Sequence, residues 1–239
     1  MKRRKAFREA RDAIIDGAGT GLASSFATAF PVTGAAVSVL SGPAIGLTVS
    51  STDPVADRLD ELQFDLGEGP CWSAFHRRSP VVCSDIRAEG ARWPAFTEAV
   101  VVDPATATVG AMYAFPLSIG SLDIGALDLY ATETRPMEPT LVEEAAMLAD
   151  LAAWQVLRVV LADHDQGYDS GSLGYSRREV HQATGMIIAQ LDVSADDAAL
   201  LLRAHAFSSG RTVREIARDV VDRRLDFARP AGTEPNDGR

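Results

Sequence analysis

Residues 112–132 read Met-Tyr-Ala-Phe-Pro-Leu-Ser-Ile-Gly-Ser-Leu-Asp-Ile-Gly-Ala-Leu-Asp-Leu-Tyr-Ala-Thr and decide the fold class of the region around them. Residues 112–119 and 124–132 are rich in aromatic and aliphatic side chains, and Gly120-Ser121 separates them, so they predict two strands joined by a tight turn. Residues 34–40 and 45–50 predict a second hairpin around Ser41-Gly42-Pro43. Two hairpins indicate an antiparallel sheet.

Helices are expected between the two hairpins. Residues 53–64 place apolar side chains at helical spacing, and Gly67-Glu68-Gly69-Pro70 ends that helix and starts a second one over residues 71–77. Residues 80–83 predict a short strand and residues 93–101 a further helix. The irregular alternation predicts an α+β domain in which helices pack against the antiparallel sheet.

The chain after residue 139 has a helical pattern throughout. Residues 140–143, Thr-Leu-Val-Glu, form a capping-box sequence that opens an apolar run, which predicts one long helix over residues 140–161. Three more capping-box sequences begin at Ser176, Ser194 and Thr212, each eighteen residues after the last. Their equal spacing predicts three helices of similar length.

Two segments around these helices are expected to lack regular structure. Residues 163–175 are rich in Asp, Gly and Ser and are predicted to be a hinge, while residues 229–239, which contain two prolines, are predicted to be a disordered tail.

Charge is unevenly distributed along the chain, whose net charge is -10. Residues 1–15 hold six basic and two acidic side chains, residues 53–165 hold seven and nineteen, and residues 166–239 hold ten arginines and eleven acidic residues. An acidic central domain is a poor polyanion binder, so nucleic-acid contacts are expected only at the ends of the chain. Residues 1–20 are accordingly expected to be a basic N-terminal segment or helix.

Composition excludes several classes of protein. The 239 residues are 46% hydrophobic and 23% charged, as in a soluble protein with one or two cores. Cys71 and Cys83 are too few for a disulfide framework and are expected to be reduced thiols in the cytoplasm. Residues 17–52 carry no charge, but prolines and glycines interrupt them, so they predict buried globular structure and no membrane span.

The C-terminal pattern resembles a known family. Residues 176–228 resemble the ANTAR family of RNA-binding transcription antiterminators, which implies a small all-α domain of three helices. The resemblance depends on residues 182–186, Gln-Ala-Thr-Gly-Met, and on two further sets, Ala198 with Leu202-Arg203 and Ala206-Phe207, and Val213, Ala217 and Val220. Thr184 is a departure, because many family members carry a basic residue there.

Residues 21–162 resemble a GAF domain, a small-molecule sensing module with a central antiparallel sheet. The stretches that carry this resemblance are residues 67–71, 80–86, 93–96, 115–117 and 124–127. The order GAF then ANTAR is similar to that of actinobacterial regulators. The resemblance implies a GAF-like domain, with an antiparallel sheet and packed helices, followed by the three-helix domain.

Candidate RNA contacts follow from the resemblance to the ANTAR family and from side-chain chemistry. A guanidinium pairs with phosphate and stacks on unpaired bases, and small residues let an RNA backbone or a neighbouring helix approach. An alternative leaves the arginines as a solvated face, with i,i+4 pairs from Arg211 to Glu215 and from Arg218 to Asp222. The candidates are Arg203, Arg211, Arg214, Arg218, Ala183, Thr184 and Gly185.

Histidines and cysteines suggest further chemistry. His181 and His205 lie on different predicted helices without a third ligand, so no metal site is expected, although His181 could stack on RNA. Cys71 falls at a helix start, where the helix dipole lowers a thiol pKa, and GAF enzymes that reduce methionine sulfoxide use cysteines. A thiol redox sensor or small redox enzyme built on Cys71 and Cys83 is therefore an alternative. Buried, inert cysteines are commoner, and no complete catalytic set is present.

The sensory domain and the long helix yield two more expectations. Trp72, Phe75, Tyr113 and Phe115 could line a ligand pocket or form plain core, and no cofactor can be named. The helix over residues 140–161 has a second apolar face, which predicts a homodimer if Trp154 and Leu157 are exposed.

The function expected from the sequence is a cytoplasmic regulator without catalysis. In it, the GAF-like domain senses a small molecule or partner and controls the binding of a structured RNA hairpin leader by the C-terminal domain. The alternatives are the redox protein above and a regulator that binds a partner protein and no RNA.

Overall fold

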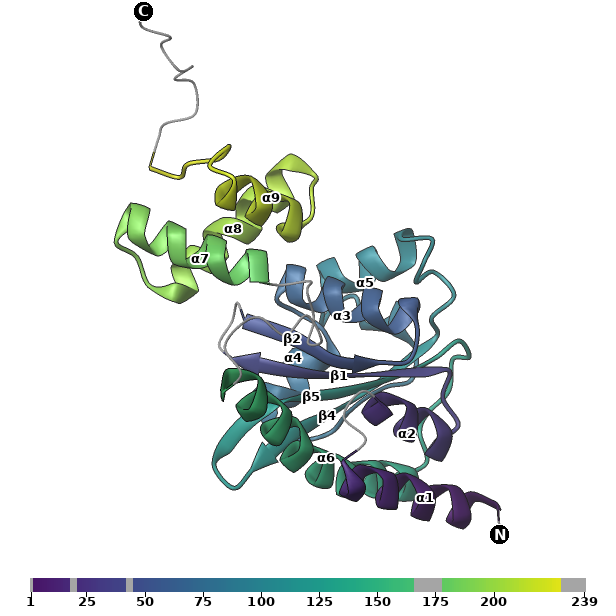
Figure 1. Cartoon of the computed structure of the whole chain (residues 1–239). Coiled ribbons are helices and arrows are strands. Elements are labelled where there is room, and N and C mark those ends of the chain that lie inside the picture. Colours follow the sequence, from purple (N-terminus) through teal and green to yellow (C-terminus); the bar gives the residue numbers. More distant parts are fainter. Residues whose placement is uncertain (1, 18–20, 42–44, 166–177, 229–239) are drawn as a thin grey trace, which may run out of the picture. The chain divides into compact units, whose positions relative to one another are not determined.

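The structure, a computed structural model, describes residues 2–17, 21–41, 45–165 and 178–228 (Figure 1). They form two compact units, which we treat separately: the first holds the described residues up to 165 and the second holds residues 178–228. The predicted tail, residues 229–239, Ser176 and most of the predicted hinge lie outside the described residues. The first three hinge residues, 163–165, are helical, because the long helix ends only at Asp165.

A five-stranded antiparallel sheet lies at the centre of the first unit, in the order β2-β1-β5-β4-β3. The strands that the two hairpins predicted are all present, and the short strand also forms. Their bounds are β1 Gly34–Ser41, β2 Ile45–Ser51, β3 Val81–Cys83, β4 Ala111–Ile119 and β5 Leu122–Ala131. The predicted α+β fold with an antiparallel sheet is confirmed.

Helices cover both faces of this sheet (Figure 1). One face carries α2, Leu22–Ala29, and α6, Pro139–Asp165, with α1, Lys2–Asp16, packed on both of them. The other face carries α3, Pro54–Leu66, and α4, Pro70–Arg77, followed by the short 3-10 helix η2, Ile86–Glu89, and α5, Pro94–Val102. The sheet is therefore the middle layer of three.

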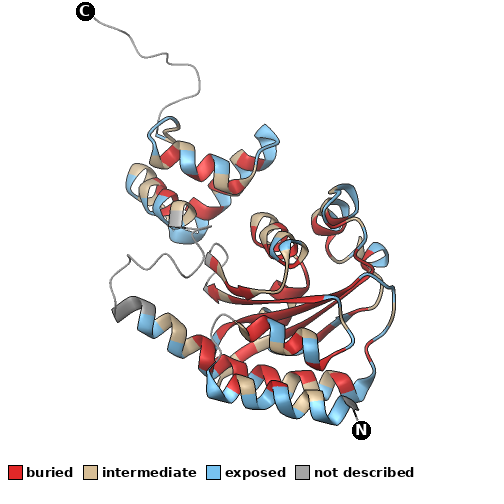
Figure 2. Ribbon diagram, turned by 45° about the vertical axis from the view of Figure 1, so that its right-hand side comes forward, coloured by how far each residue is buried: buried red, intermediate tan, exposed pale blue. Residues whose placement is uncertain are grey.

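Two hydrophobic clusters sandwich the sheet, and β4 contributes to both. Its residues Tyr113 and Phe115 belong to the cluster under α1, α2 and α6, whereas Met112 and Ala114 belong to the cluster under α3 and α5. All four side chains are fully buried, and Figure 2 shows the strands of the sheet coloured as buried over most of their length. Burial on both faces explains why this strand reads as a continuous apolar run instead of alternating with polar residues.

The Gly-Glu-Gly-Pro sequence at residues 67–70 forms the corner between α3 and α4. Gly67 ends α3 in the left-handed conformation, with φ of 68°, and Gly69, with φ of 132°, precedes Pro70 at the start of α4. Both values lie where glycine is favoured. The Glu68 carboxylate then accepts a hydrogen bond from the Phe96 amide at 2.6 Å and so caps α5. This one segment positions three helices.

The basic N-terminal residues form a helix that is part of the first unit. Arg3 of α1 pairs with Glu144 of α6 at 3.1 Å, and the Gln155 side chain of α6 donates to the Ile15 carbonyl of α1 at 3.0 Å. These two contacts show that α1 and α6 run parallel, with Ala10 and Ile14 of α1 buried in the core. Residues 2–16 are therefore an outer layer of the first unit.

The long predicted helix is present as α6 and has 27 residues. It begins at Pro139, so Thr140 lies inside the first turn, and the capping box predicted at residues 140–143 is wrong because proline already occupies the helix start. By length and composition, residues 139–162 would suffice to cross a membrane. Because Ala145, Leu148 and Ala152 are fully buried against the sheet, we interpret α6 as a core helix.

The second unit consists of α7, Arg178–Leu191, α8, Ala195–Ser209, and α9, Val213–Val221. Ser194 caps α8, and a reciprocal capping box between Thr212 and Glu215 opens α9, so both predicted starts are confirmed. The core of this unit combines residues of all three helices: Ala183, Ile187, Ala198, Leu202, Ala206, Val213, Ile216, Ala217 and Val220.

Candidate functional site

Two of the predicted RNA-contact arginines meet one carboxylate on the surface of the three-helix unit. Arg214 and Arg218 lie one turn apart on α9, and both reach Glu179 of α7, with nitrogen-to-oxygen distances of 3.3 and 3.2 Å. All three side chains are partly exposed. A carboxylate that bridges two guanidinium groups occupies the geometry that a phosphate would take.

A second ion-pair network continues along α9. Asp219 accepts hydrogen bonds from Arg211 at 2.7 Å and from Arg224 at 2.8 Å, and these two guanidinium groups lower the pKa of its carboxyl group. Asp222 pairs with Arg224 at 2.8 Å. The arginines are therefore ion-paired, as the solvated-face alternative requires, but with partners other than those that i,i+4 spacing predicted. Arg211 bonds the Glu215 backbone carbonyl at 3.4 Å, not its carboxylate.

The three small residues predicted on α7 divide between core and surface. Ala183 and Thr184 are buried, and the Thr184 hydroxyl donates to the Val180 carbonyl at 2.8 Å. Both side chains belong to the inner face of the helix, which favours the packing alternative for them over a direct contact with RNA. Gly185 is exposed, and a Cβ atom added there would meet nothing within 4 Å.

The remaining candidates of this unit lie on α7 and α8. Arg203 is half-buried on α8, and His181 is exposed on α7. His205 packs edge-on against the ring of Phe227, with centroids 5.5 Å apart. Within the described ranges, no three His, Cys, Asp or Glu side chains come together as a metal site.

The four aromatic residues predicted to line a ligand pocket lie on opposite faces of the sheet. Trp72 and Phe75 both belong to α4, and their rings make an edge-to-face contact. They lie in a cluster with Leu40 and Phe64. Tyr113 and Phe115 are buried on the face covered by α6. One pocket therefore cannot contain all four, because β4 and α4 present them to different layers.

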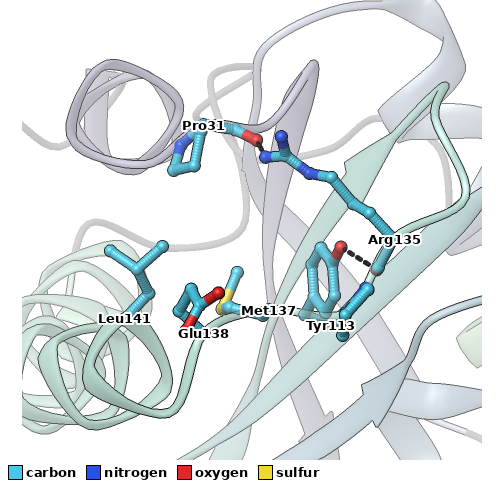
Figure 3. Close-up of a pocket in the computed structure, with 7 residues that line it drawn as sticks. Pro31, Tyr113, Arg135, Met137, Glu138 and Leu141 are labelled. Carbon is cyan, nitrogen blue, oxygen red and sulfur yellow. Dashed lines mark hydrogen bonds between the residues drawn. The ribbon is translucent and has the colours of Figure 1, made fainter.

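A pocket of about 340 Å³ opens where β4 meets the start of α6 (Figure 3). Tyr113 is the predicted residue that lines it, and its hydroxyl donates to the Arg135 carbonyl at 2.8 Å. The Arg135 guanidinium donates to the Pro31 carbonyl across the pocket. The volume is in the range of small-molecule sites. Its lining residues are Pro31, Tyr113, Arg135, Pro136, Met137, Glu138 and Leu141.

A buried polar cluster on the opposite face of the sheet was missed by sequence reasoning. The Asp128 carboxylate of β5 accepts a hydrogen bond from the Gln63 amide at 2.6 Å, and Gln63 in turn accepts from the Cys71 backbone amide at 2.8 Å. The Asp60 carboxylate accepts from Thr48 at 2.6 Å and also from Ser38. Acidic residues inside otherwise apolar stretches were the available sequence signal.

Burial dominates the electrostatics of this cluster. Asp128 is 6% exposed, and its second carboxylate oxygen has no hydrogen-bond partner among the described residues. Loss of hydration raises the pKa of Asp128 well above its usual range, and the nearby charge of Asp60 raises it further, while the Gln63 hydrogen bond opposes both effects. The cluster therefore favours a protonated Asp128.

The cysteines occupy separate, fully buried positions. Cys71 belongs to the cluster around Trp72, and Cys83 to the cluster under α5. Burial raises the pKa of the Cys83 thiol to about 12, and the charge of Glu89 adds to this effect. Both thiols are buried, and the raised pKa of Cys83 disfavours its thiolate, so this geometry does not favour the redox alternative.

The outer face of α6 carries an apolar stripe. Met147, Trp154 and Leu161 follow one another at seven-residue intervals and are 54%, 54% and 57% exposed, while Leu157 is half-buried. A repeat of seven places side chains along one seam of a helix. Of the two residues whose exposure the dimer prediction requires, Trp154 is exposed and Leu157 is partly covered.

Two family models match the chain. Residues 6–154, more than half of the chain, match the family model of the GAF domain, and residues 175–221 match that of the ANTAR domain. Among curated proteins, none matches the chain in sequence.

Two solved structures are similar to the first unit. The GAF domain of an Acinetobacter phosphoenolpyruvate-protein phosphotransferase is 14% identical, with 70% of this chain and 94% of that chain covered and a TM-score of 0.49. The free methionine-R-sulfoxide reductase of Neisseria meningitidis, solved with its substrate, is 14% identical, with 67% and 91% covered and a TM-score of 0.48.

Proposed function

The chain belongs to the GAF domain family and continues into an ANTAR domain, and on this premise we propose that it is a regulator that binds a structured RNA hairpin and so prevents transcription termination. Its sensory domain would take up a small molecule or partner and control that binding. The activity requires no catalysis and no membrane, and it belongs in the cytoplasm, where transcripts are made.

The observation that carries the proposal is the outer surface of α7 and α9. Arg214 and Arg218 project side by side and are held by the single carboxylate of Glu179. A phosphate can replace that carboxylate, because both are oxyanions that accept paired hydrogen bonds from guanidinium groups. Exposed surface pairs contribute little to folding stability, so their exchange for RNA phosphates is not opposed by a large loss of stability.

Gly185 is a second exposed feature of α7. A glycine inside a helix costs about 1 kcal/mol relative to alanine, and here no neighbouring atom requires the absence of a side chain. Its exposed backbone leaves α7 open to close approach by a sugar-phosphate chain. Close packing against neighbouring helices explains the small side chain of Ala183, which is buried in the core, but not that of Gly185.

Replacing Arg214 and Arg218 by alanine is expected to weaken RNA binding roughly tenfold or more at low salt, and to reduce the slope of log affinity against log salt by about two, because two phosphate contacts are lost. Gel-shift titrations of transcribed leader hairpins at several salt concentrations measure both quantities.

The matched variant Glu179→Gln is expected to change the affinity in the opposite direction. It removes the carboxylate that competes with phosphate while the two arginines remain. The proposal would be contradicted if the variant without Arg214 and Arg218 bound RNA with the same affinity as the natural chain. If the chain instead binds a partner protein, it should bind no RNA, and its binding to that protein should depend little on salt concentration.

Gly185→Ala is expected to separate stability from function. The added methyl group should raise the unfolding midpoint of the three-helix unit by roughly 4–8 °C, because helix propensity improves by about 1 kcal/mol. The same methyl should weaken hairpin binding by about 1–3 kcal/mol through steric overlap with RNA. Calorimetry and gel shifts on one protein preparation test both effects. An unchanged RNA affinity would show that Gly185 is not part of the RNA-binding surface.

Control by the sensory domain would operate through a shift of populations. A ligand changes RNA binding only if it binds one conformation of the chain better than the other. The pocket beside Tyr113 and the buried Asp128 cluster are the two places in the described part of the sensory domain where such a preference could arise.

A homodimer through α6 completes the proposed function. The stripe of Met147, Trp154 and Leu161 has the seven-residue spacing with which helices pair, and a second copy offers the same stripe in return. A parallel pair of α6 helices would bring two RNA-binding units onto one hairpin pair.

Trp154→Glu is expected to convert a dimer into a monomer, because a carboxylate at the centre of the paired stripe has to be buried without a partner. Light scattering at micromolar concentration should give twice 25.4 kDa for the natural chain and 25.4 kDa for the variant. Leu122→Glu, at a similarly exposed position on β5, should remain dimeric. A monomer mass for the natural chain would refute the dimer.

A further inference from the structure

One stretch of the second unit is free of acidic residues. Residues 198–214 contain three arginines and one histidine and neither Asp nor Glu, in a chain whose net charge is -10. Within this stretch lies Phe207, whose 82% exposure is the highest among the large hydrophobic side chains that the structure describes. The combination of an exposed aromatic ring with a basic stretch of sequence makes Phe207 a candidate contact residue.

The position of Phe207 follows from the way α8 packs. Ala199, Leu202 and Ala206 form the buried side of this helix. Phe207 stands outside that set, and Arg203, four residues earlier, is its neighbour on the helix surface. Arg211 follows directly, since its amide donates to the Ala206 carbonyl at 3.0 Å. Phe207 therefore has Arg203 one helical turn before it and Arg211 directly after the end of α8.

The backbone that carries the ring is well fixed. Gly210 ends α8 in the left-handed conformation, with φ of 65°, and its amide donates to the carbonyls of Ala206 and Phe207. The hydroxyls of Ser208 and Ser209 both donate to the His205 carbonyl, at 3.0 and 2.7 Å. Phe207 therefore projects from a hydrogen-bonded last turn of α8 and not from a loop. Because this backbone is already ordered, a planar group can pack against the ring with little loss of conformational entropy.

We propose that Phe207 is a stacking platform for an unpaired RNA base, with Arg203 and Arg211 providing the positive charge for the adjoining phosphates. The assignment rests on the proposed RNA-binding function and adds a contact with the hairpin loop to the phosphate contacts of α9. A nucleobase offers a flat apolar face next to a negative backbone, which matches an exposed ring beside Arg203 and Arg211. Arg211 is paired with Asp219 at 2.7 Å, and on RNA binding a phosphate would take the place of that carboxylate. An apolar protein partner would match the ring but not the arginines.

The test uses the full chain and two labelled RNAs: hairpins with a fixed stem and a randomised loop, and a blunt duplex of the same stem. Phe207→Ala is expected to weaken hairpin binding roughly tenfold, as for loss of one stacked base. Its salt slope should stay unchanged, since no phosphate contact is removed. Duplex binding should be unaffected. Phe207→Trp should bind hairpins like the natural chain, whereas Phe207→Leu, which keeps apolar volume without a ring, should resemble the alanine variant.

The outcomes separate this assignment from the proposed function. Hairpin binding by Phe207→Ala or Phe207→Leu that equals that of the natural chain would overturn the stacking role while leaving the regulator intact. Equal weakening on hairpin and duplex would also overturn it. The stacking role would also be overturned if Phe207→Ala had the mass of a monomer, because the ring would then belong to an interface between two copies. If the natural chain binds neither RNA, the proposed function itself fails.

Discussion

Gly125→Ala is expected to destabilise the sensory domain by roughly 2–4 kcal/mol, the range of strong overpacking. Gly125 lies in the central strand β5, opposite Val39 of β1 and Leu117 of β4. A Cβ atom there would approach the Ser38 carbonyl oxygen to 1.9 Å and the Val39 Cα to 2.9 Å. These neighbours are backbone atoms of a paired strand, so β1 could yield only by giving up its hydrogen bonds with β5.

Thermal unfolding of the full chain measures this effect, and the midpoint of the sensory-domain transition should fall by roughly 5–15 °C. Gly90→Ala is the matched control, because Gly90 lies outside the sheet, has φ of -58° and has open space where a Cβ would sit. That variant should unfold within a degree or two of the natural chain. A similar midpoint for Gly125→Ala would mean that β1 and β5 are less tightly paired than described.

Asp128→Asn is expected to raise the stability of the sensory domain at neutral pH, because asparagine has no charge to desolvate and no proton to take up on folding. Burial and the charge of Asp60 raise the pKa of Asp128 in the folded state above that in the unfolded state. The folded state therefore binds the proton more tightly, and stability falls as pH rises from the unfolded pKa through the folded pKa. Asparagine removes this dependence, because it has no proton to lose.

Denaturant titrations between pH 4 and pH 8 test the sign, over a range that begins near the ordinary aspartate pKa. The variant should exceed the natural chain most at the alkaline end, and the difference should shrink toward pH 4. The Gln63 amide keeps an oxygen acceptor in asparagine, so its hydrogen bond survives. In Asp128→Ala that acceptor is lost, and this control should be less stable than the asparagine variant. An advantage of Asp128→Asn that grew on acidification would contradict the raised pKa.

Much of the fold could be predicted from local sequence patterns, because each pattern has a local cause. Gly67 and Gly69 adopt backbone conformations that glycine favours, and Thr212 and Glu215 satisfy amides at a helix start. The same logic failed at Thr140, where the capping-box sequence competes with Pro139, and proline one residue earlier begins the helix instead.

The candidate sites were less predictable, because they depend on which face of each element is covered. Thr184 and Gly185 are adjacent in sequence, yet the first is buried and the second is exposed. Phe115 and Trp72 are equally apolar, but the sheet separates them. Ion pairs between helices, such as Arg218 with Glu179, join residues far apart in the chain, and spacing within one helix predicts nothing about them.

The dimensions of α6 bear on how a signal could leave the sensory domain. Its 27 residues form one uninterrupted helix, about 40 Å long at 1.5 Å per residue. It packs against β4, β5 and α1, and Leu157, Val159 and Val160 are the last of its side chains that the structure places against the core of the first unit. The exposed turn that begins at Leu161 extends past that core, so a slight tilt of the packed part would give a larger displacement at the far end of this arm. Stiffness of this arm, rather than any particular contact, would then set how faithfully movement is transmitted.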